Sequence, residues 1–131
     1  MKHLPTVAGA LLGFLFVASG LVVLLDLAPM PKMPDGSPAD WFAKAFGPTG
    51  YMKFVKVMEV LGGILVAIPR VRNLGLLVLG PILINILAYQ VFIMNGAGLW
   101  SPPLFLIVGL TAFLLWAGRK QFLGLISPGK E

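Results

Sequence analysis

Two oppositely charged residues three positions apart, Lys56 and Glu59, are the pair in this sequence best suited to chemistry. They lie inside an apolar stretch that runs from about residue 50 to residue 68. On an α-helix, residues at i and i+3 are neighbours on one face, so the ammonium and the carboxylate can form an ion pair. A carboxyl deep in an apolar segment is a functional candidate by default, because burying its charge is expensive. Two interpretations stay open for Glu59: a structural ion pair that fixes helix packing, and a group that binds a ligand.

Further polar side chains occur at a similar depth in the other apolar stretches. Asn85 and Tyr89 share one helical face, and Gln90 joins that face only if Pro81 distorts the helix. Asp26 lies near the end of the first stretch. We expect a cavity between the second and third stretches, and its candidate ligand-binding residues are Glu59, Lys56, Asn85, Tyr89, Gln90 and Asp26. The cavity itself would be bounded by Lys56, Glu59, Asn85 and Tyr89.

The alternative to a cavity is a fully packed bundle in which these polar groups bond only one another. Hydrogen bonds between helices inside a membrane contribute about 0.6–2 kcal/mol each. We expect Ser19 and Thr111 to have this structural role, and it is also open for Asn85.

The elements that position these groups must be apolar helices. The chain has 131 residues, of which 58% are hydrophobic and only 11% are charged, whereas soluble domains carry roughly 25% charged residues. Its solvent is therefore largely lipid, which excludes a soluble enzyme. The 10 Lys and Arg residues exceed the 5 Asp and Glu residues. They lie at the ends of apolar runs and form no continuous basic stripe, so we expect no nucleic-acid partner.

Four apolar stretches predict an all-α, four-helix transmembrane bundle that forms one integral membrane domain over residues 1–131. Each has close to the ~20 residues that cross a bilayer, and their approximate bounds are 4–28, 50–68, 73–94 and 102–118. A segment rich in Pro and Gly joins the first two stretches. Within it we expect a short interfacial helix near Asp40–Phe46, capped by Asp40, with Trp41, Phe42 and Phe46 facing lipid headgroups together.

The distribution of basic residues predicts the orientation. Four spans place both termini on one side, and that side carries six basic residues: Lys2, Arg70, Arg72, Arg119, Lys120 and Lys130. The other side carries four: Lys32, Lys44, Lys53 and Lys56. Because cytoplasmic loops carry the excess of Lys and Arg, we expect a multi-pass protein of the cell inner membrane with cytoplasmic termini.

Several kinds of site are excluded or disfavoured by the residues present. The chain contains no cysteine and one histidine, His3, so we expect no metal site and assign no catalytic residue. No cofactor motif is present. The Gly9-x-x-x-Gly13 spacing permits close approach of two helix backbones. It predicts either packing inside the bundle or a homodimer through Gly9 and Gly13.

Three segments together resemble the DoxX-like family of small four-span bacterial membrane proteins. They are LFVASGLVVLLDLAPMPKMP, KVMEVLGGILVAIPR and LGPILINILAYQVF, and a short loop and FLLWAGRKQF follow them. The family's usual glutamate matches Glu59 and its asparagine matches Asn85. Where relatives often carry histidine, this chain has Gln90 and Asp26, so the resemblance implies no proton-transfer or metal role at those two positions.

The resemblance implies a fold more firmly than an activity. Members of the family are associated with quinone-linked oxidoreductases, with oxidant-defence complexes and with the assembly of membrane proteins. The first expectation is therefore a non-catalytic membrane subunit, or an assembly protein that binds a membrane-protein partner. The alternative is a protein that binds a quinone or another lipid and is associated with a redox system.

Overall fold

A computed structural model describes residues 3–28, 32–97, 99 and 101–126 of the chain. Within these ranges the secondary structure is entirely helical. The long helices are α1 (Leu4–Leu24), α3 (Tyr51–Ala67), α4 (Arg72–Ala88) and α5 (Pro102–Ala117). The shorter ones are α2 (Pro38–Phe46), η1 (Pro69–Val71), η2 (Tyr89–Ile93) and α6 (Arg119–Leu123). The predicted all-α class is confirmed for the described residues.

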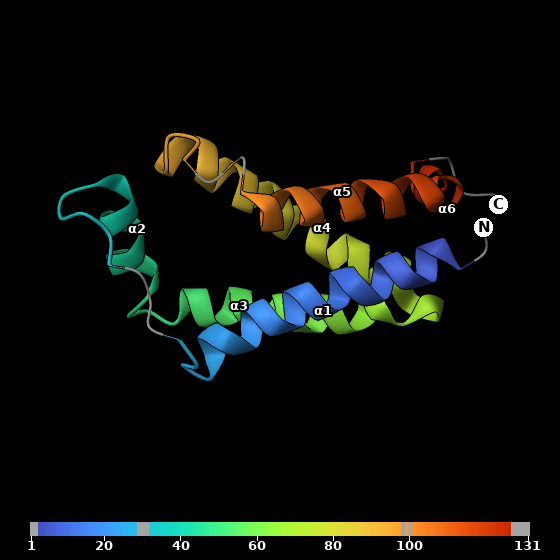
Figure 1. Ribbon diagram of the computed structural model, residues 1–131, viewed down its shortest axis with the longest axis horizontal. Helices are drawn as coiled ribbons and strands as arrows, with labels where there is room; N and C mark the ends of the chain where they lie inside the picture. The colour runs from blue at the N-terminus through green and yellow to red at the C-terminus, as the bar shows by residue number, and fades with distance from the viewer. Residues whose placement is uncertain (1–2, 29–31, 98, 100, 127–131) are drawn as a thin grey trace.

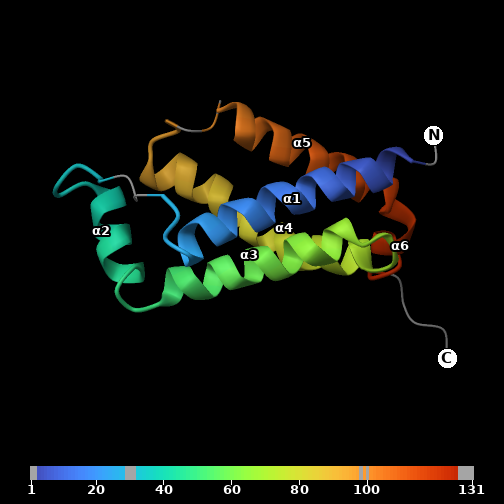
Figure 2. The same cartoon turned by 60° about the horizontal axis from the view of Figure 1, so that its bottom comes forward.

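The four long helices lie side by side and alternate in direction (Figures 1 and 2). We call the end where α1 begins and α5 ends the terminal end, and the opposite end, next to α2, the α2 end. Helix α1 packs chiefly against α3, and α3 packs against α4. Helix α5 lies against α1 and, less extensively, against α4.

Two helical segments are long and apolar enough to cross a membrane: Leu4–Leu24 and Pro69–Ile93, the latter formed by η1, α4 and η2 together. Helix α5 is equally apolar but shorter, with 16 residues. Helix α3 has 17 residues and includes Lys53, Lys56 and Glu59. By length and composition, two helices can therefore span a bilayer.

A buried apolar cluster lies mainly in the terminal half of the bundle. It combines side chains of all four long helices: Ala8, Leu12, Phe16, Val66, Leu76, Leu79 and Leu114. Large apolar side chains that point away from the bundle are exposed along the same helices, including Phe14, Phe54, Ile84 and Phe105. This distribution is the one expected of helices whose outer faces meet lipid.

Asp26 ends the first helix, which stops four residues before the expected bound at residue 28. Its φ angle of 51° is left-handed. The Asp26 N–H donates to the carbonyl of Val23, and the Leu27 N–H donates to the carbonyl of Val22. These two bonds form a Schellman motif, which satisfies carbonyl groups at a helix end. A short polar side chain tolerates this conformation better than a branched apolar one.

Glycines bring the backbones of α1 and α3 into close approach. A Cβ atom placed on Gly63 would lie 2.9 Å from the carbonyl oxygen of Gly13, and one placed on Gly9 would lie 2.7 Å from that of Val66. Gly20 continues the contact, because a Cβ there would lie 3.1 Å from the carbonyl oxygen of Lys56. Gly9 and Gly13 are therefore buried between two helices of the same chain. The surface that a homodimer through them would need is covered by α3.

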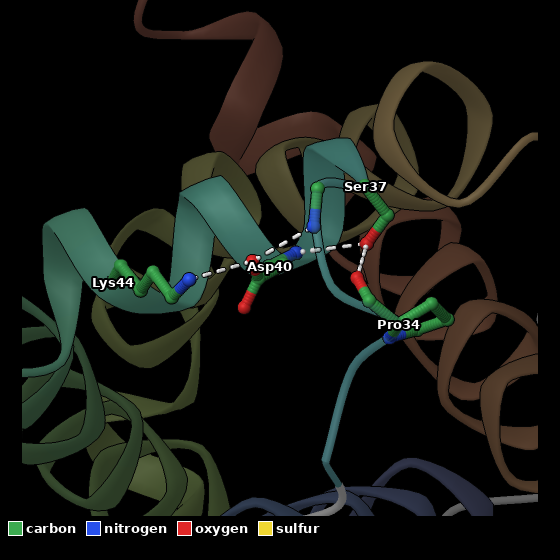
Figure 3. Close-up of polar contacts among 5 residues, drawn as sticks. Pro34, Ser37, Asp40 and Lys44 are labelled. Carbon is green, nitrogen blue, oxygen red and sulfur yellow. Dashed lines mark hydrogen bonds and ion pairs between the residues drawn. The ribbon is translucent and has the colours of Figure 1, made fainter.

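Helix α2 is capped by Ser37, one turn earlier than the sequence predicts (Figure 3). The Ser37 Oγ accepts the Asp40 N–H at 3.2 Å and donates to the Pro34 carbonyl at 2.6 Å. Asp40 is the third helical residue; its carboxylate accepts the Gly36 N–H at 3.1 Å and pairs with the Lys44 Nζ at 2.9 Å. The contact with Lys44 and the bond from Gly36 lower the pKa of Asp40 below its ordinary value, so this carboxyl is ionised at neutral pH.

The aromatic residues of α2 do not all face outward, which corrects the expectation from the sequence. The rings of Phe42 and Phe46 meet edge to face at 4.4 Å between centroids. Phe42 also lies 4.7 Å from Tyr89, and Phe46 lies 4.6 Å from Tyr51. Only Trp41, at 62% exposure, is turned away from the bundle. Helix α2 is therefore attached by its phenylalanines to the start of α3 and to η2.

We predict that Gly13→Ala lowers the stability of the protein by about 1–3 kcal/mol, since the added methyl group would overlap the Gly63 carbonyl oxygen. The matched control is Gly109→Ala on α5, where a Cβ would meet nothing within 4 Å. The control should melt at or above the wild-type Tm, because alanine favours helix more than glycine does. Thermal melts in detergent measure both, and equal Tm values for the two variants would contradict the close α1–α3 approach.

Candidate functional site

A cavity of about 300 Å³ lies among the four long helices, in the half of the bundle nearer to α2. Its polar lining consists of Ser19, Lys56, Glu59, Gln90 and Ser101. Its apolar lining consists of Phe16, Leu83, Ile86, Pro103, Leu104 and Ile107. The sequence places the cavity between the second and third stretches alone, whereas side chains of α1 and α5 also form its walls.

The ion pair predicted between Lys56 and Glu59 is present in the cavity wall. The Lys56 Nζ lies 2.9 Å from the Glu59 Oε2. The Glu59 side chain is 3% exposed and that of Lys56 is 17% exposed, so the pair is largely removed from solvent. Glu59 lies on the buried face of α3 together with Gly62, Gly63 and Val66. The face that packs on α1 and α4 therefore carries the carboxylate into the bundle.

Gln90 lines the cavity together with Leu83 and Ile86, and it also lies in a π-helical turn. Tyr89–Ile93 forms this turn, in which the Met94 N–H donates to the Tyr89 carbonyl. Because Leu83 and Ile86 precede Gln90 by seven and four residues, the three share one face of a regular helix, and the π-turn is not what brings Gln90 to the cavity. Gln90 therefore lines the cavity without joining the face of Asn85, and the distortion of the helix lies eight residues beyond Pro81 and not at the proline itself.

Three of the six predicted ligand-binding residues do not line the cavity, which corrects the sequence-based assignment. Asn85 is exposed, and its Nδ2 donates to the Pro81 carbonyl at 3.0 Å on the same helix. Tyr89 contacts Phe42 of α2. Asp26 is exposed at the end of α1, where its backbone terminates the helix. Lys56, Glu59 and Gln90 remain as the predicted residues that the fold brings together.

Two hydroxyl groups differ from the roles expected for them. Ser19 is exposed on α1 and lines the cavity, so the cavity reaches the flank of the bundle. Thr111 is buried, but its hydroxyl has no hydrogen-bond partner among the described residues. The expectation that Thr111 makes a hydrogen bond between helices is therefore wrong for the described residues.

Sequence reasoning missed Ser101 and the apolar wall formed by α5. Ser101 is the N-cap of α5, and it immediately precedes two prolines at the first helical positions. Prolines at the start of a helix indicate that boundary, so the sequence predicts Ser101 as the residue before a helix. The residues that lie near Ser101 in space could not be predicted, because they come from other helices.

The arrangement suits a ligand with a polar head and an apolar body. The lining includes the ammonium, the amide of Gln90 and two hydroxyls as polar groups, and leucine, isoleucine and phenylalanine side chains form apolar walls. Mostly apolar walls with a few convergent polar groups are typical of small-molecule sites. The described residues contain no group of three or more His, Cys, Asp or Glu side chains that could hold a metal ion.

Comparisons with family models, with curated proteins and with solved structures give no match. The resemblance to the DoxX-like family therefore stays a prediction from the three sequence segments, and the function of the cavity has to be argued from its own residues.

We predict that Glu59→Gln destabilises the protein by about 3–5 kcal/mol, because Lys56 would keep a largely buried charge without a partner. Replacing both residues, as in Lys56→Met with Glu59→Met, removes both charges and should recover most of that loss. The control is Lys53→Met, which alters an exposed lysine on the same helix. Thermal melts of the four proteins in detergent would contradict the structural importance of the pair if Glu59→Gln melted like Lys53→Met.

Proposed function

We propose that this protein is a four-span integral membrane protein that binds a small lipid-like molecule, such as a quinone, in the cavity beside Lys56 and Glu59. The single observation that carries the proposal is a buried ion pair in the wall of a cavity that is otherwise mainly apolar. Charged groups inside a membrane bundle are expensive and are retained chiefly where they serve a pathway or a site.

The packing of the helices supports four spans. Helices α3 and α5 run antiparallel to their apolar neighbours and have 17 and 16 residues, which corresponds to about 26 and 24 Å. The hydrocarbon core is about 30 Å thick. Lys53 is exposed near the start of α3, and a lysine near a helix end can extend its ammonium to the headgroups. The other two charges of α3, on Lys56 and Glu59, neutralise each other in the ion pair, which lowers the free-energy cost of placing them in hydrocarbon.

The basic residues support cytoplasmic termini in the inner membrane. Arg70, Arg72, Arg119 and Lys120 lie at the terminal end, whereas Lys2 and Lys130 fall outside the described residues. An excess of Lys and Arg on the side of the termini favours the cytoplasm for that side.

We predict that a cysteine at position 121 is protected, and one at position 49 is labelled, when intact cells meet a membrane-impermeant maleimide. The Gln121→Cys and Thr49→Cys variants each introduce the single thiol of the chain, because the sequence has no cysteine. Both positions are exposed. Labelling both variants after the membrane is opened is the control. Labelling at position 121 but not at position 49 in intact cells would reverse the orientation.

The chemistry of the cavity favours a carbonyl-bearing or anionic head. The Lys56 ammonium has three N–H donors and its partner carboxylate uses only part of that capacity. A quinone ring offers two carbonyl acceptors and a flat apolar body, so it matches both parts of the lining. The membrane-subunit or assembly role expected from the sequence is compatible with such a site, and the exposed Trp41 on α2 offers a contact surface for a partner.

We predict that Ile107→Trp, which places a larger ring at the cavity wall, reduces binding of decylubiquinone by roughly tenfold or more. The matched control is Leu106→Trp, since Leu106 is the neighbouring residue, is exposed and does not line the cavity. Both variants are titrated in detergent micelles, and organic extracts of the purified proteins are compared by mass spectrometry. If wild type and both variants bound equal amounts of decylubiquinone and of copurified lipid, the cavity would not be the binding site.

A further inference from the structure

We propose that a second cavity, at the terminal end of the bundle, binds the phosphate group of an acidic phospholipid. This cavity has a volume of about 390 Å³ and is formed by the starts of α1 and α4, η1, the end of α5 and α6. Its polar side chains are Arg70, Arg72, Asn73 and Gln121. The inference rests on the proposed insertion into a membrane but concerns a different site and a different ligand.

The charge of this end is positive and uncompensated within the described part of the chain. The described acidic residues lie elsewhere: Asp26, Asp35 and Asp40 near the α2 end, and Glu59 in the first cavity. The two ion pairs of the described residues use Lys44 and Lys56. Arg70 and Arg72 therefore have no carboxylate partner there, and they present guanidinium groups, whose geometry suits phosphate oxygens.

Arg72 is held in place against α1. Its Nη2 donates to the Thr6 Oγ1 at 3.3 Å. A Cβ atom on Gly9 would lie 2.9 Å from the Arg72 Nε, so the absence of a side chain at Gly9 leaves room for the guanidinium. The Arg72 Nε is buried and has no hydrogen-bond partner among the described residues. Because this atom has almost no accessible surface, an anion in the cavity would be bound by the other guanidinium N–H groups of Arg72 and by Arg70.

Asn73 is held in the same way against the end of α5. A Cβ atom on Gly118 would lie 2.9 Å from the Asn73 Oδ1 and 3.3 Å from its Nδ2. Two consecutive polar side chains are thus placed by glycines on two different helices. The arrangement places a charged and a neutral donor in the lining of one cavity.

The helix ends add to the positive potential. Helices α1 and α4 both begin at this cavity, and neither has a side-chain cap or an acidic residue in its first turn. Helix N-termini favour anions. Two carbonyls at the end of α5 already accept hydrogen bonds: Leu114 accepts from the Gly118 N–H, and Trp116 accepts from the Arg119 Nη1 at 2.9 Å.

The rest of the lining favours a lipid over a free phosphate ion. Pro5, Leu74, Leu114 and Ala117 give the cavity apolar walls, which a phosphate ion would not contact but a diacylglycerol moiety would. Next to it, the Arg119 guanidinium lies 4.2 Å above the ring of Trp116, which is 62% exposed. Tryptophan and arginine together are typical of the membrane–water interface. Basic pockets between helices on the cytoplasmic side bind acidic lipid headgroups in other membrane proteins.

The test compares retention of phosphatidylglycerol and phosphatidylcholine by native mass spectrometry, after the protein is extracted from vesicles that contain equal amounts of both. We expect the wild-type protein to retain phosphatidylglycerol about tenfold or more over phosphatidylcholine. The Arg70→Gln/Arg72→Gln protein should lose this preference. The matched control, Arg119→Gln/Lys120→Gln, removes two positive charges from the same end but not from the cavity lining, and it should keep the preference.

Equal loss of preference in the two double variants would overturn the site, because diffuse charge would then explain the binding. If the Arg70→Gln/Arg72→Gln protein does not fold, Gly118→Ala replaces it: its methyl group displaces Asn73, and an unchanged preference in that variant would equally overturn the site. Millimolar inorganic phosphate should not displace the lipid; displacement would identify free phosphate as the ligand and overturn the proposal. Failure of the wild-type protein to float with any vesicle would refute the proposed membrane insertion, whereas flotation without lipid preference would refute this site alone.

Discussion

The close approach of α1 and α3 is the constraint on which the rest of the structure depends. Gly13 and Gly63 face each other through their backbones, so neither helix can rotate without placing a side chain in the contact. Fixing the rotation of α3 also fixes the direction of Glu59, one turn before Gly63. The same contact therefore builds the interface and turns an ionisable side chain toward the interior.

The two halves of the bundle differ because only one of them is filled by apolar side chains. In the terminal half, Leu12, Val66 and Leu79 interdigitate and are fully buried. In the other half, where Tyr89–Ile93 forms a π-turn, the lining of the cavity is partly polar. Packing stabilises the first half; in the second, an ion pair and a cavity take the place of a dense core.

The sequence predicts the long helices well because their apolar runs are bounded by prolines, glycines and charges. Pro69 follows the second run and Pro102 begins the fourth, and both positions agree with the observed helix bounds to within a residue or two. The ion pair of Lys56 and Glu59 could also be predicted, because residues three positions apart on one helix are neighbours on its surface. Asn85 and Tyr89 were misplaced because helical spacing shows which residues share a face but not which face turns toward the neighbouring helices. The partners of Gly9 and Gly118 depend on which helices meet, and no local pattern contains that information.

The exposed position of Ser19 on α1 has a consequence for how a ligand would reach the first cavity. Ser19 both lines the cavity and meets the surroundings on the flank of the bundle, while Phe42 and Phe46 tie α2 to the neighbouring helix ends. In a bilayer, that flank faces the acyl chains. Access would then be lateral, from within one leaflet, and occupancy would follow the mole fraction of the ligand in the lipid phase and not its concentration in water.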